Sequence, residues 1–157
     1  MPPEIGRKAP LFTLTADDGS VVSLRELRGS KVVLYFYPKD DTKGCTVEAC
    51  EFRDQWAELT RMGVVVLGVS PDGIKSHEQF RSKFELPFRL LSDPDHAVAL
   101  RYGVWGEKSL YGRKYLGVIR TTFLIDEAGV IRQVFERVKP RGHSRQVLQA
   151  ISLLDGE

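Results

Sequence analysis

The chain has 157 residues, of which 42% are hydrophobic and 28% charged, and its formal net charge is +2. These values are typical of a globular protein and predict a single domain, residues 1–157, that buries roughly two-thirds of the surface of its unfolded chain. The small net charge argues against binding to nucleic acid or to a membrane surface, and no apolar run approaches the ~20 residues of a membrane span. The first residues lack the apolar core of a secretory signal, so a reducing cytoplasm is the expected compartment.

The first half of the chain predicts strands that alternate with a helix. Residues 11–24 indicate a β-hairpin around an Asp-Gly-Ser turn. The run from Val32 to Tyr37 is apolar, β-branched and aromatic throughout, which is typical of a strand buried on both faces. A helix is expected from about Gly44 to Met62, and a second buried strand from Val64 to Val69.

The second half predicts shorter elements. In chain order they are a helix with His77, Phe80 and Phe84 that stops at Pro87, a strand at 90–91, a short helix opened by Asp93, a Gly-, Tyr- and Lys-rich loop at about 103–117, a hairpin of 118–125 with 130–135, and a helix with the apolar stripe Val147, Leu148, Ile151 and Leu154. Helix–strand alternation followed by a closing hairpin predicts an α/β fold, a central mixed β-sheet flanked by helices on both faces.

Both cysteines of the chain follow the strand that ends near Tyr37. Thr42 stands three residues before Cys45, so we expect Thr42 to cap a helix whose third residue is Cys45. There the sulfur faces free backbone N–H groups and the positive end of the helix dipole, which favour a thiolate. Pro38 fixes the turn and can shield one side of the sulfur. The alternative is a small buried apolar residue in an ordinary helix start, but the Pro-x-x-x-Thr-x-x-Cys spacing and the second cysteine favour thiol chemistry.

Cys50 follows Cys45 by five residues. In an intact α-helix this offset separates the two Cα atoms by about 8.5–9 Å, whereas a disulfide needs a Cα separation of roughly 4.4–6.8 Å. The two cysteines therefore cannot form a bond while the helix is whole. Either Cys50 is an inert core residue, or the helix unwinds locally during a reaction cycle.

Arg120 lies in the run from Val118 to Ile125, which otherwise has the pattern of a core strand. A buried cation is costly unless it is paired. One candidate partner is a structural carboxylate. The other is a thiolate together with an anionic leaving oxygen, both of which a planar guanidinium can bind at once. The strand alone does not decide between them.

These residues carry a resemblance to a known family. Pro38, Thr42, Cys45 and Arg120 match the Pro-x-x-x-Thr-x-x-Cys and distal Arg signature of peroxiredoxins. The spacing to Cys50 resembles the bacterioferritin comigratory protein, or peroxiredoxin Q, branch of that family. Further matches lie at 103–108, at 120–126 and around His143, so that the resemblance covers almost the whole chain.

The resemblance implies a thioredoxin-like fold and the reduction of hydrogen peroxide or organic hydroperoxides. Cys45 would be the peroxidatic thiolate that becomes a sulfenic acid, with Thr42 and Arg120 orienting the peroxide. Cys50 would resolve the sulfenic acid as an intramolecular disulfide, which thioredoxin or a glutaredoxin would reduce. The resemblance implies no metal and no organic cofactor, and a monomer.

Two other functions remain open from the sequence. One is a thiol–disulfide oxidoreductase that acts on proteins, although the chain lacks the C-x-x-C motif that would favour it. The other is a non-enzymatic holdase or redox-sensing module. The histidines His77, His96 and His143 are scattered without metal-ligand spacing, so we expect each at the surface or at a helix cap.

Overall fold

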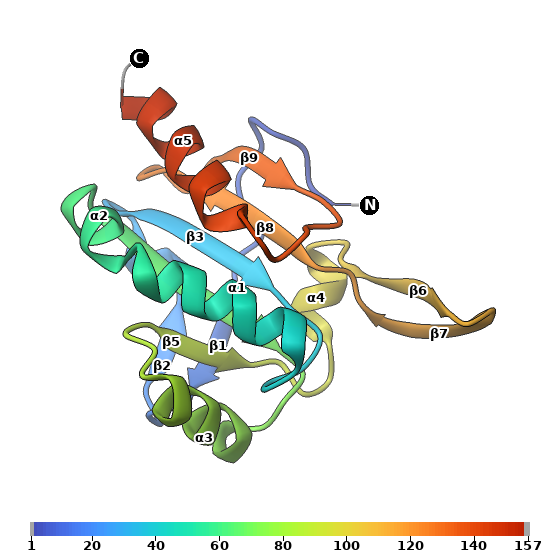
Figure 1. Ribbon diagram of the computed structural model, residues 1–157. Helices are drawn as coiled ribbons and strands as arrows, with labels where there is room; N and C mark the ends of the chain where they lie inside the picture. The colour runs from blue at the N-terminus through green and yellow to red at the C-terminus, as the bar shows by residue number, and fades with distance from the viewer. Residues whose placement is uncertain (1, 156–157) are drawn as a thin grey trace.

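The computed structural model describes residues 2–155 and contains a seven-stranded mixed β-sheet (Figure 1). Its three central strands run parallel to one another, and the outer strands pair antiparallel. In spatial order the strands are β2 (Val21–Ser23), β1 (Thr13–Ala16), β5 (Arg89–Ser92), β4 (Val64–Ser70), β3 (Lys31–Phe36), β8 (Thr121–Ile125) and β9 (Ile131–Phe135). The predicted mixed sheet and its N-terminal hairpin are confirmed.

Helices cover both faces of this sheet, as predicted. Four of them lie on one face, α1 (Lys43–Asp54), α2 (Trp56–Arg61), α3 (Ile74–Phe84) and α5 (His143–Asp155), while the opposite face carries α4 (Ala97–Arg101) and the 3-10 helix η1 (Leu24–Leu27). Strand β3 and the residue after it contribute side chains to the hydrophobic cores on both faces of the sheet, because successive side chains of a strand point to opposite faces. Val32, Leu34 and Phe36 pack on the α4 side, and Val33, Tyr35 and Tyr37 pack on the α1 side.

The helix expected from Gly44 to Met62 is interrupted. It ends at Asp54 and a second helix begins at Trp56, because Gln55 leaves helical geometry with φ −97° and ψ 10°. The N–H of Gln55 is still satisfied, since the carbonyls of Glu51 and Phe52 both accept from it. No Gly or Pro marks this break, so it could not be predicted from the residue pattern. Among residues 2–155, no helix has the length and apolar character needed to cross a membrane.

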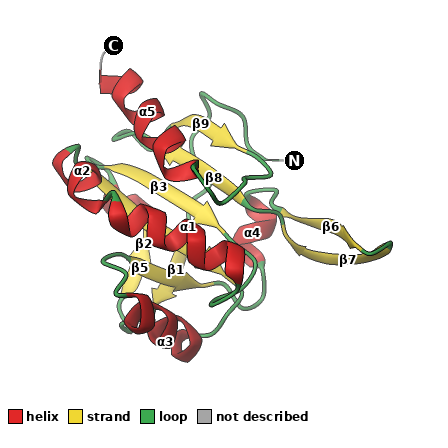
Figure 2. Cartoon of the chain, in the orientation of Figure 1, coloured by secondary structure: helices red, strands yellow, loops and turns green. Residues whose placement is uncertain are grey.

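The loop predicted over residues 103–117 is wrong. These residues form an antiparallel hairpin of β6 (Trp105–Leu110) and β7 (Arg113–Val118), which projects from the body as a two-stranded ribbon (Figure 2). Its turn residues Tyr111 and Gly112 both have positive φ, the geometry of a tight hairpin turn that usually reads Asn-Gly in sequence. Because Tyr111 stands where such turns usually have Asn, the sequence pattern did not indicate a turn here.

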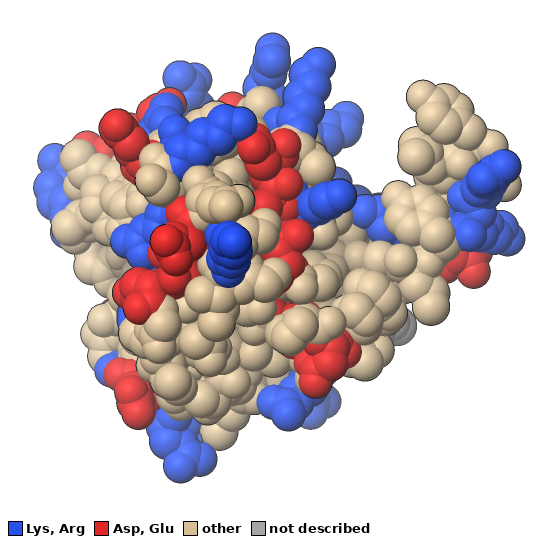
Figure 3. All heavy atoms as spheres, turned by 90° about the horizontal axis from the view of Figure 1, so that it is seen from below, with Lys and Arg blue, Asp and Glu red and all other residues tan. Residues whose placement is uncertain are grey.

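This hairpin exposes apolar and basic side chains together. Leu110, Tyr111, Tyr115 and Leu116 are exposed. Figure 3 shows the projection standing away from a body on which acidic and basic residues are interspersed.

The strand predicted from Val118 is also shorter than expected, because β7 ends at Val118 and β8 begins at Thr121. Arg120 therefore lies in the connection between two strands rather than inside one.

The loop from β3 to α1 is tied to the body at Asp40, which is buried. The side chain of Asp40 hydrogen-bonds three side chains, one just after β3 and two on α3, and its backbone N–H donates to a carboxylate. The partners are Tyr37 Oη at 2.6 Å, His77 Nδ1 at 2.7 Å, Ser76 Oγ at 2.8 Å and, for the N–H, Asp72 Oδ2 at 2.8 Å. His77 is fully buried, so its expected surface position is wrong, because this internal carboxylate supplies a partner that the sequence does not reveal.

Candidate active site

The first turn of α1 holds Cys45 in the predicted position. Thr42 is the N-cap with extended backbone, and Cys45 is the third helical residue. The Thr42 hydroxyl does not cap the helix but donates to the carbonyl of Lys39 at 2.9 Å. The first N–H groups of the helix therefore remain available to the sulfur or to a bound oxygen. Cys45 itself is only 1% exposed.

The guanidinium of Arg120 contacts both kinds of partner that the sequence left open, a carboxylate and the cysteine sulfur. Its Nη2 donates to Cys45 Sγ at 3.3 Å, and its Nη1 donates to Glu48 Oε1 at 2.7 Å. Burial alone would lower the pKa of Arg120, but the neighbouring Glu48 and Cys45 outweigh it and raise the pKa. Arg120 thus remains a fixed cation against the sulfur.

The backbone around Arg120 is fixed by hydrogen bonds to two other segments. The N–H of Ile119 donates to the carbonyl of Val104 at 2.7 Å, and the carbonyl of Arg120 accepts from the N–H of Val138 at 3.0 Å. The guanidinium also needs space, which Gly44 provides. A Cβ at Gly44 would lie 3.1 Å from Arg120 Nη2 and 3.3 Å from Pro140.

Glu48 is the site residue that sequence reasoning missed. Its side chain has no exposed surface, and its Oε2 has no hydrogen-bond partner among the described residues. Burial raises the pKa of Glu48 to about 7, although Arg120 opposes the shift. One signal was present, because Glu48 follows Cys45 by three residues and so lies on the same helix face as the buried Ala49 and Phe52.

Cys50 also lies in α1, and both thiols are free. It is half-buried, and burial raises the pKa of its thiol. In the intact helix its Cα stays about 8.5–9 Å from that of Cys45, so the structure brings Cys45 and Arg120 together but keeps Cys50 apart. Pro38 lies half-buried in the loop that precedes α1.

A hollow of about 450 Å³ reaches Arg120 from the solvent. It is lined by β6 and by the segments on either side of the last hairpin, through Glu107, Lys108, Ser109, Ile119, Arg120, Arg137 and Val138. Burial lowers the pKa of Lys108, and the nearby Arg120 adds to that shift. The hollow offers a small polar solute a route to the guanidinium that contacts the sulfur.

Asp40, Asp72 and His77 are the described residues whose spacing could suit a metal ion, with ligand atoms within 4.8 Å of one another. Each is already used in hydrogen bonds. His77 faces Asp40 through Nδ1 and the carbonyl of Leu91 through Nε2, at 2.7 and 2.9 Å. The cluster therefore acts as a tether for the loop before α1.

His143 is also buried, against its expected surface or capping position. It begins α5, and its Nε2 hydrogen-bonds Thr122 Oγ1 at 2.8 Å while its ring packs edge-on against Phe52 and Phe135. Burial lowers the pKa of His143, which keeps the ring neutral. His96 does begin α4 as its N-cap, as expected.

Comparisons with known proteins agree on one family. Residues 5–134 match the AhpC/TSA family. The chain is 57% identical to a putative peroxiredoxin bcp of Coxiella burnetii, over 92% of this chain and 96% of that protein. It is 47% identical to peroxiredoxin Bcp of Escherichia coli, over 94% of each.

Solved structures give the same result for the fold. Peroxiredoxin Q of Xanthomonas campestris is 39% identical, covers 90% of each chain and superposes with a TM-score of 0.86. A structure of the bacterioferritin comigratory protein of the same organism, described for its alkyl peroxide reduction activity, is 38% identical over 91% of each chain with a TM-score of 0.87. The fold is therefore thioredoxin-like, and the chain belongs to the AhpC/TSA family of peroxiredoxins, in its bacterioferritin comigratory protein or peroxiredoxin Q branch.

Proposed function

We propose that this peroxiredoxin reduces hydrogen peroxide and organic hydroperoxides with Cys45 as the attacking thiolate. The observation that carries the proposal is the Arg120 guanidinium on the Cys45 sulfur at the first turn of α1. A fixed cation and free N–H groups stabilise a thiolate, which is the nucleophilic form of cysteine. The alkyl peroxide reduction described for the Xanthomonas campestris relative supports the same chemistry here.

In the proposed reaction, Cys45 attacks the terminal peroxide oxygen, the O–O bond breaks, and the sulfur becomes a sulfenic acid. Arg120 and the N–H groups at the start of α1 bind the peroxide oxygens, where negative charge develops as the bond breaks. Thr42 orients the peroxide at the helix start, and Pro38 shields the sulfur from the side of the preceding loop. The substrate arrives through the hollow at Arg120.

The second half of the proposed cycle uses Cys50. Because an intact α1 holds the two cysteines too far apart, the first turns of the helix unwind before a Cys45–Cys50 disulfide forms. The raised pKa of the Cys50 thiol keeps it unreactive until unwinding exposes it. Thioredoxin or a glutaredoxin then reduces the disulfide, and the enzyme works as a cytoplasmic monomer without a metal or organic cofactor.

Arg120→Lys is expected to slow Cys45 oxidation by about 10- to 1,000-fold, because lysine keeps the charge but loses the fork that reaches two partners at once. The measurement is the second-order rate constant of Cys45 oxidation by hydrogen peroxide. An unchanged rate with lower thermal stability would instead assign Arg120 to a purely structural ion pair with Glu48.

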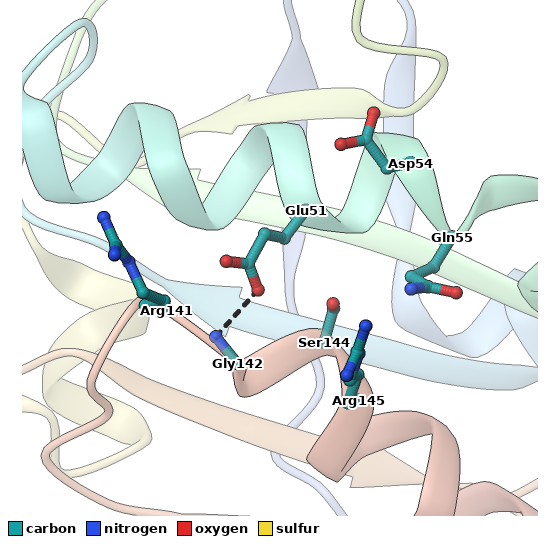
Figure 4. Close-up of a pocket in the computed structure, with 7 residues that line it drawn as sticks. All are labelled: Glu51, Asp54, Gln55, Arg141, Gly142, Ser144 and Arg145. Atoms are coloured by element: carbon teal, nitrogen blue, oxygen red, sulfur yellow. Dashed lines mark hydrogen bonds between the residues drawn. The ribbon is translucent and has the colours of Figure 1, made fainter.

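Glu51→Ala is expected to speed disulfide formation. The Glu51 carboxylate accepts a hydrogen bond from the N–H of Gly142 at 2.9 Å, across a cleft between α1 and the start of α5 (Figure 4). Unwinding of α1 through residue 51 breaks this bond, so its removal lowers the cost by about 1–2 kcal/mol, or roughly 5- to 30-fold in the unwinding equilibrium. Glu51→Gln, which keeps an acceptor oxygen, is the matched control. Equal rates of sulfenic acid decay in wild type and Glu51→Ala would exclude this role.

One assay separates the proposal from its rivals. Thioredoxin, thioredoxin reductase and NADPH are mixed with the protein, and NADPH consumption is followed with and without hydrogen peroxide. A thiol peroxidase consumes NADPH only when peroxide is present. A protein thiol–disulfide oxidoreductase instead needs a disulfide substrate, and a holdase or redox-sensing module shows no sustained consumption.

A further inference from the structure

Two acids share one cation at the reacting sulfur. Arg120 Nη2 contacts Cys45 and Arg120 Nη1 contacts Glu48, so a thiolate together with an ionised Glu48 would place two negative charges against a single guanidinium. The pocket is closed to solvent at both acids, since Cys45 is 1% exposed and the Glu48 side chain is not exposed. Solvent therefore cannot stabilise the second negative charge.

Among the residues that the structure describes, no other group near Glu48 supplies the missing positive charge. Tyr35 has a pKa raised well above its usual value by burial and by Glu48, and His143 has a pKa lowered by burial, so both are neutral. Glu51 adds negative charge and raises the pKa of Glu48 further. Lys108 donates to the carbonyl of Val118 and is not paired with Glu48.

The second oxygen of Glu48 fits a protonated carboxyl. Oε1 accepts from Arg120, whereas Oε2 is buried without a partner among residues 2–155. An ionised carboxylate buried in this way would leave half of its charge without a hydrogen bond, whereas a protonated Oε2 carries no charge and leaves only a neutral O–H without a partner, which costs less free energy. Burial also raises the pKa of Glu48 to about 7, in the direction of the protonated form.

We infer that Glu48 holds a proton while Cys45 is a thiolate and releases it when the sulfur is oxidised, so that the pocket itself balances the proton taken up by the leaving oxygen. The inference rests on the proposed peroxidase reaction. The thiolate gives an electron pair to the terminal oxygen, the O–O bond breaks, and the leaving hydroxide or alkoxide takes up one proton. The sulfenic acid is neutral, so Arg120 then pairs with Glu48 alone, which ionises. Glu48 acts through Arg120 and is a positioning residue rather than one in contact with the peroxide.

The test counts protons. In a Cys50→Ser chain, which stops at the sulfenic acid, hydrogen peroxide is added and the proton uptake is read with a pH indicator in stopped flow. Thiolate loss is followed by its ultraviolet absorbance. About one pH unit below the pKa of Glu48, the parent chain should take up close to no protons per thiolate consumed, and Glu48→Gln close to one. About one unit above it, both chains should take up close to one. Glu78→Gln, which removes an exposed acid on α3, should behave as the parent chain.

Equal proton uptake by the parent and Glu48→Gln chains below that pKa would overturn the inference while leaving the peroxidase reaction intact. If hydrogen peroxide consumed no thiolate, the proposed function would fail and the inference with it. Infrared difference spectra of the Cys50→Ser chain, which stops at the sulfenic acid with α1 intact, give an answer without a substitution at Glu48. Oxidation should remove the carbonyl band of one protonated carboxylic acid and add a carboxylate band, and an unchanged acid band would reject the inference.

Discussion

Cys45→Ser should reduce peroxide consumption to the uncatalysed background while the protein still folds. A serine hydroxyl is a much weaker acid than a thiol, so the nucleophile of the proposed reaction is lost although the shape of the site is nearly kept. Peroxide consumption should be measured with thioredoxin, thioredoxin reductase and NADPH, and folding by thermal unfolding. Serine can still accept the hydrogen bond from Arg120 Nη2, so the unfolding midpoint should change by no more than about 2–4 °C, the shift expected for 1 kcal/mol in a chain of this length.

The control for Cys45→Ser is Cys50→Ser, which keeps the attacking sulfur and should still react once with peroxide. Substantial peroxidase activity in Cys45→Ser would contradict the proposed mechanism, because no other cysteine lies beside Arg120. Loss of folding in Cys45→Ser would be recognised by the unfolding curve and is separable from loss of the nucleophile.

Cys50→Ser should undergo one rapid oxidation by peroxide, then remain a sulfenic acid and stop cycling with thioredoxin. The first step needs only Cys45 and Arg120, while the second needs a thiol that can reach the sulfenic sulfur. Stopped-flow oxidation, a sulfenic acid probe and steady-state NADPH consumption separate the two steps. The expected result is a nearly unchanged first step with turnover lost.

Amide hydrogen exchange gives the structural counterpart of this result. In the wild-type chain, exchange over residues 46–51 should be faster in the disulfide form than in the reduced form, because the first turns of a helix have few hydrogen bonds to lose. Continued turnover of Cys50→Ser, with no Cys45–Cys50 bond detectable in the oxidised wild type, would remove Cys50 from the mechanism. The chain would then be a one-cysteine peroxidase resolved by an external thiol.

The start of α1 was predictable because its determinants are local. Thr42 and Cys45 are three residues apart, and the apolar strand before them fixes where the helix can begin. The β6–β7 hairpin was missed because Tyr111 takes the positive φ that a sequence normally marks with Asn or Gly. The burial of His77 could not be predicted, because its partner Asp40 is 37 residues away in sequence.

Arg120 shows a second limit of the sequence. Its pairing with a sulfur or a carboxylate was left open, and the structure places both against it because Glu48 lies one helical turn beyond Cys45. Helical spacing predicts that these two residues share a face. It does not predict that a guanidinium 72 residues from Glu48 arrives between them, since that depends on how β8 packs beside β3.

The tether at Asp40 has a consequence for the speed at which α1 can re-form. Starting a helix is slow and unfavourable, because several backbone dihedrals must be fixed before the first hydrogen bond is made. Asp40 is bound to α3 and to Tyr37 just ahead of the helix, so the chain enters α1 from a fixed position even when the following turns are unwound. After the disulfide of the proposed cycle is reduced, the first turn of α1 therefore re-forms from a chain whose entry is already fixed, which lowers the entropy cost of restarting the helix, and rewinding should not limit the rate of turnover.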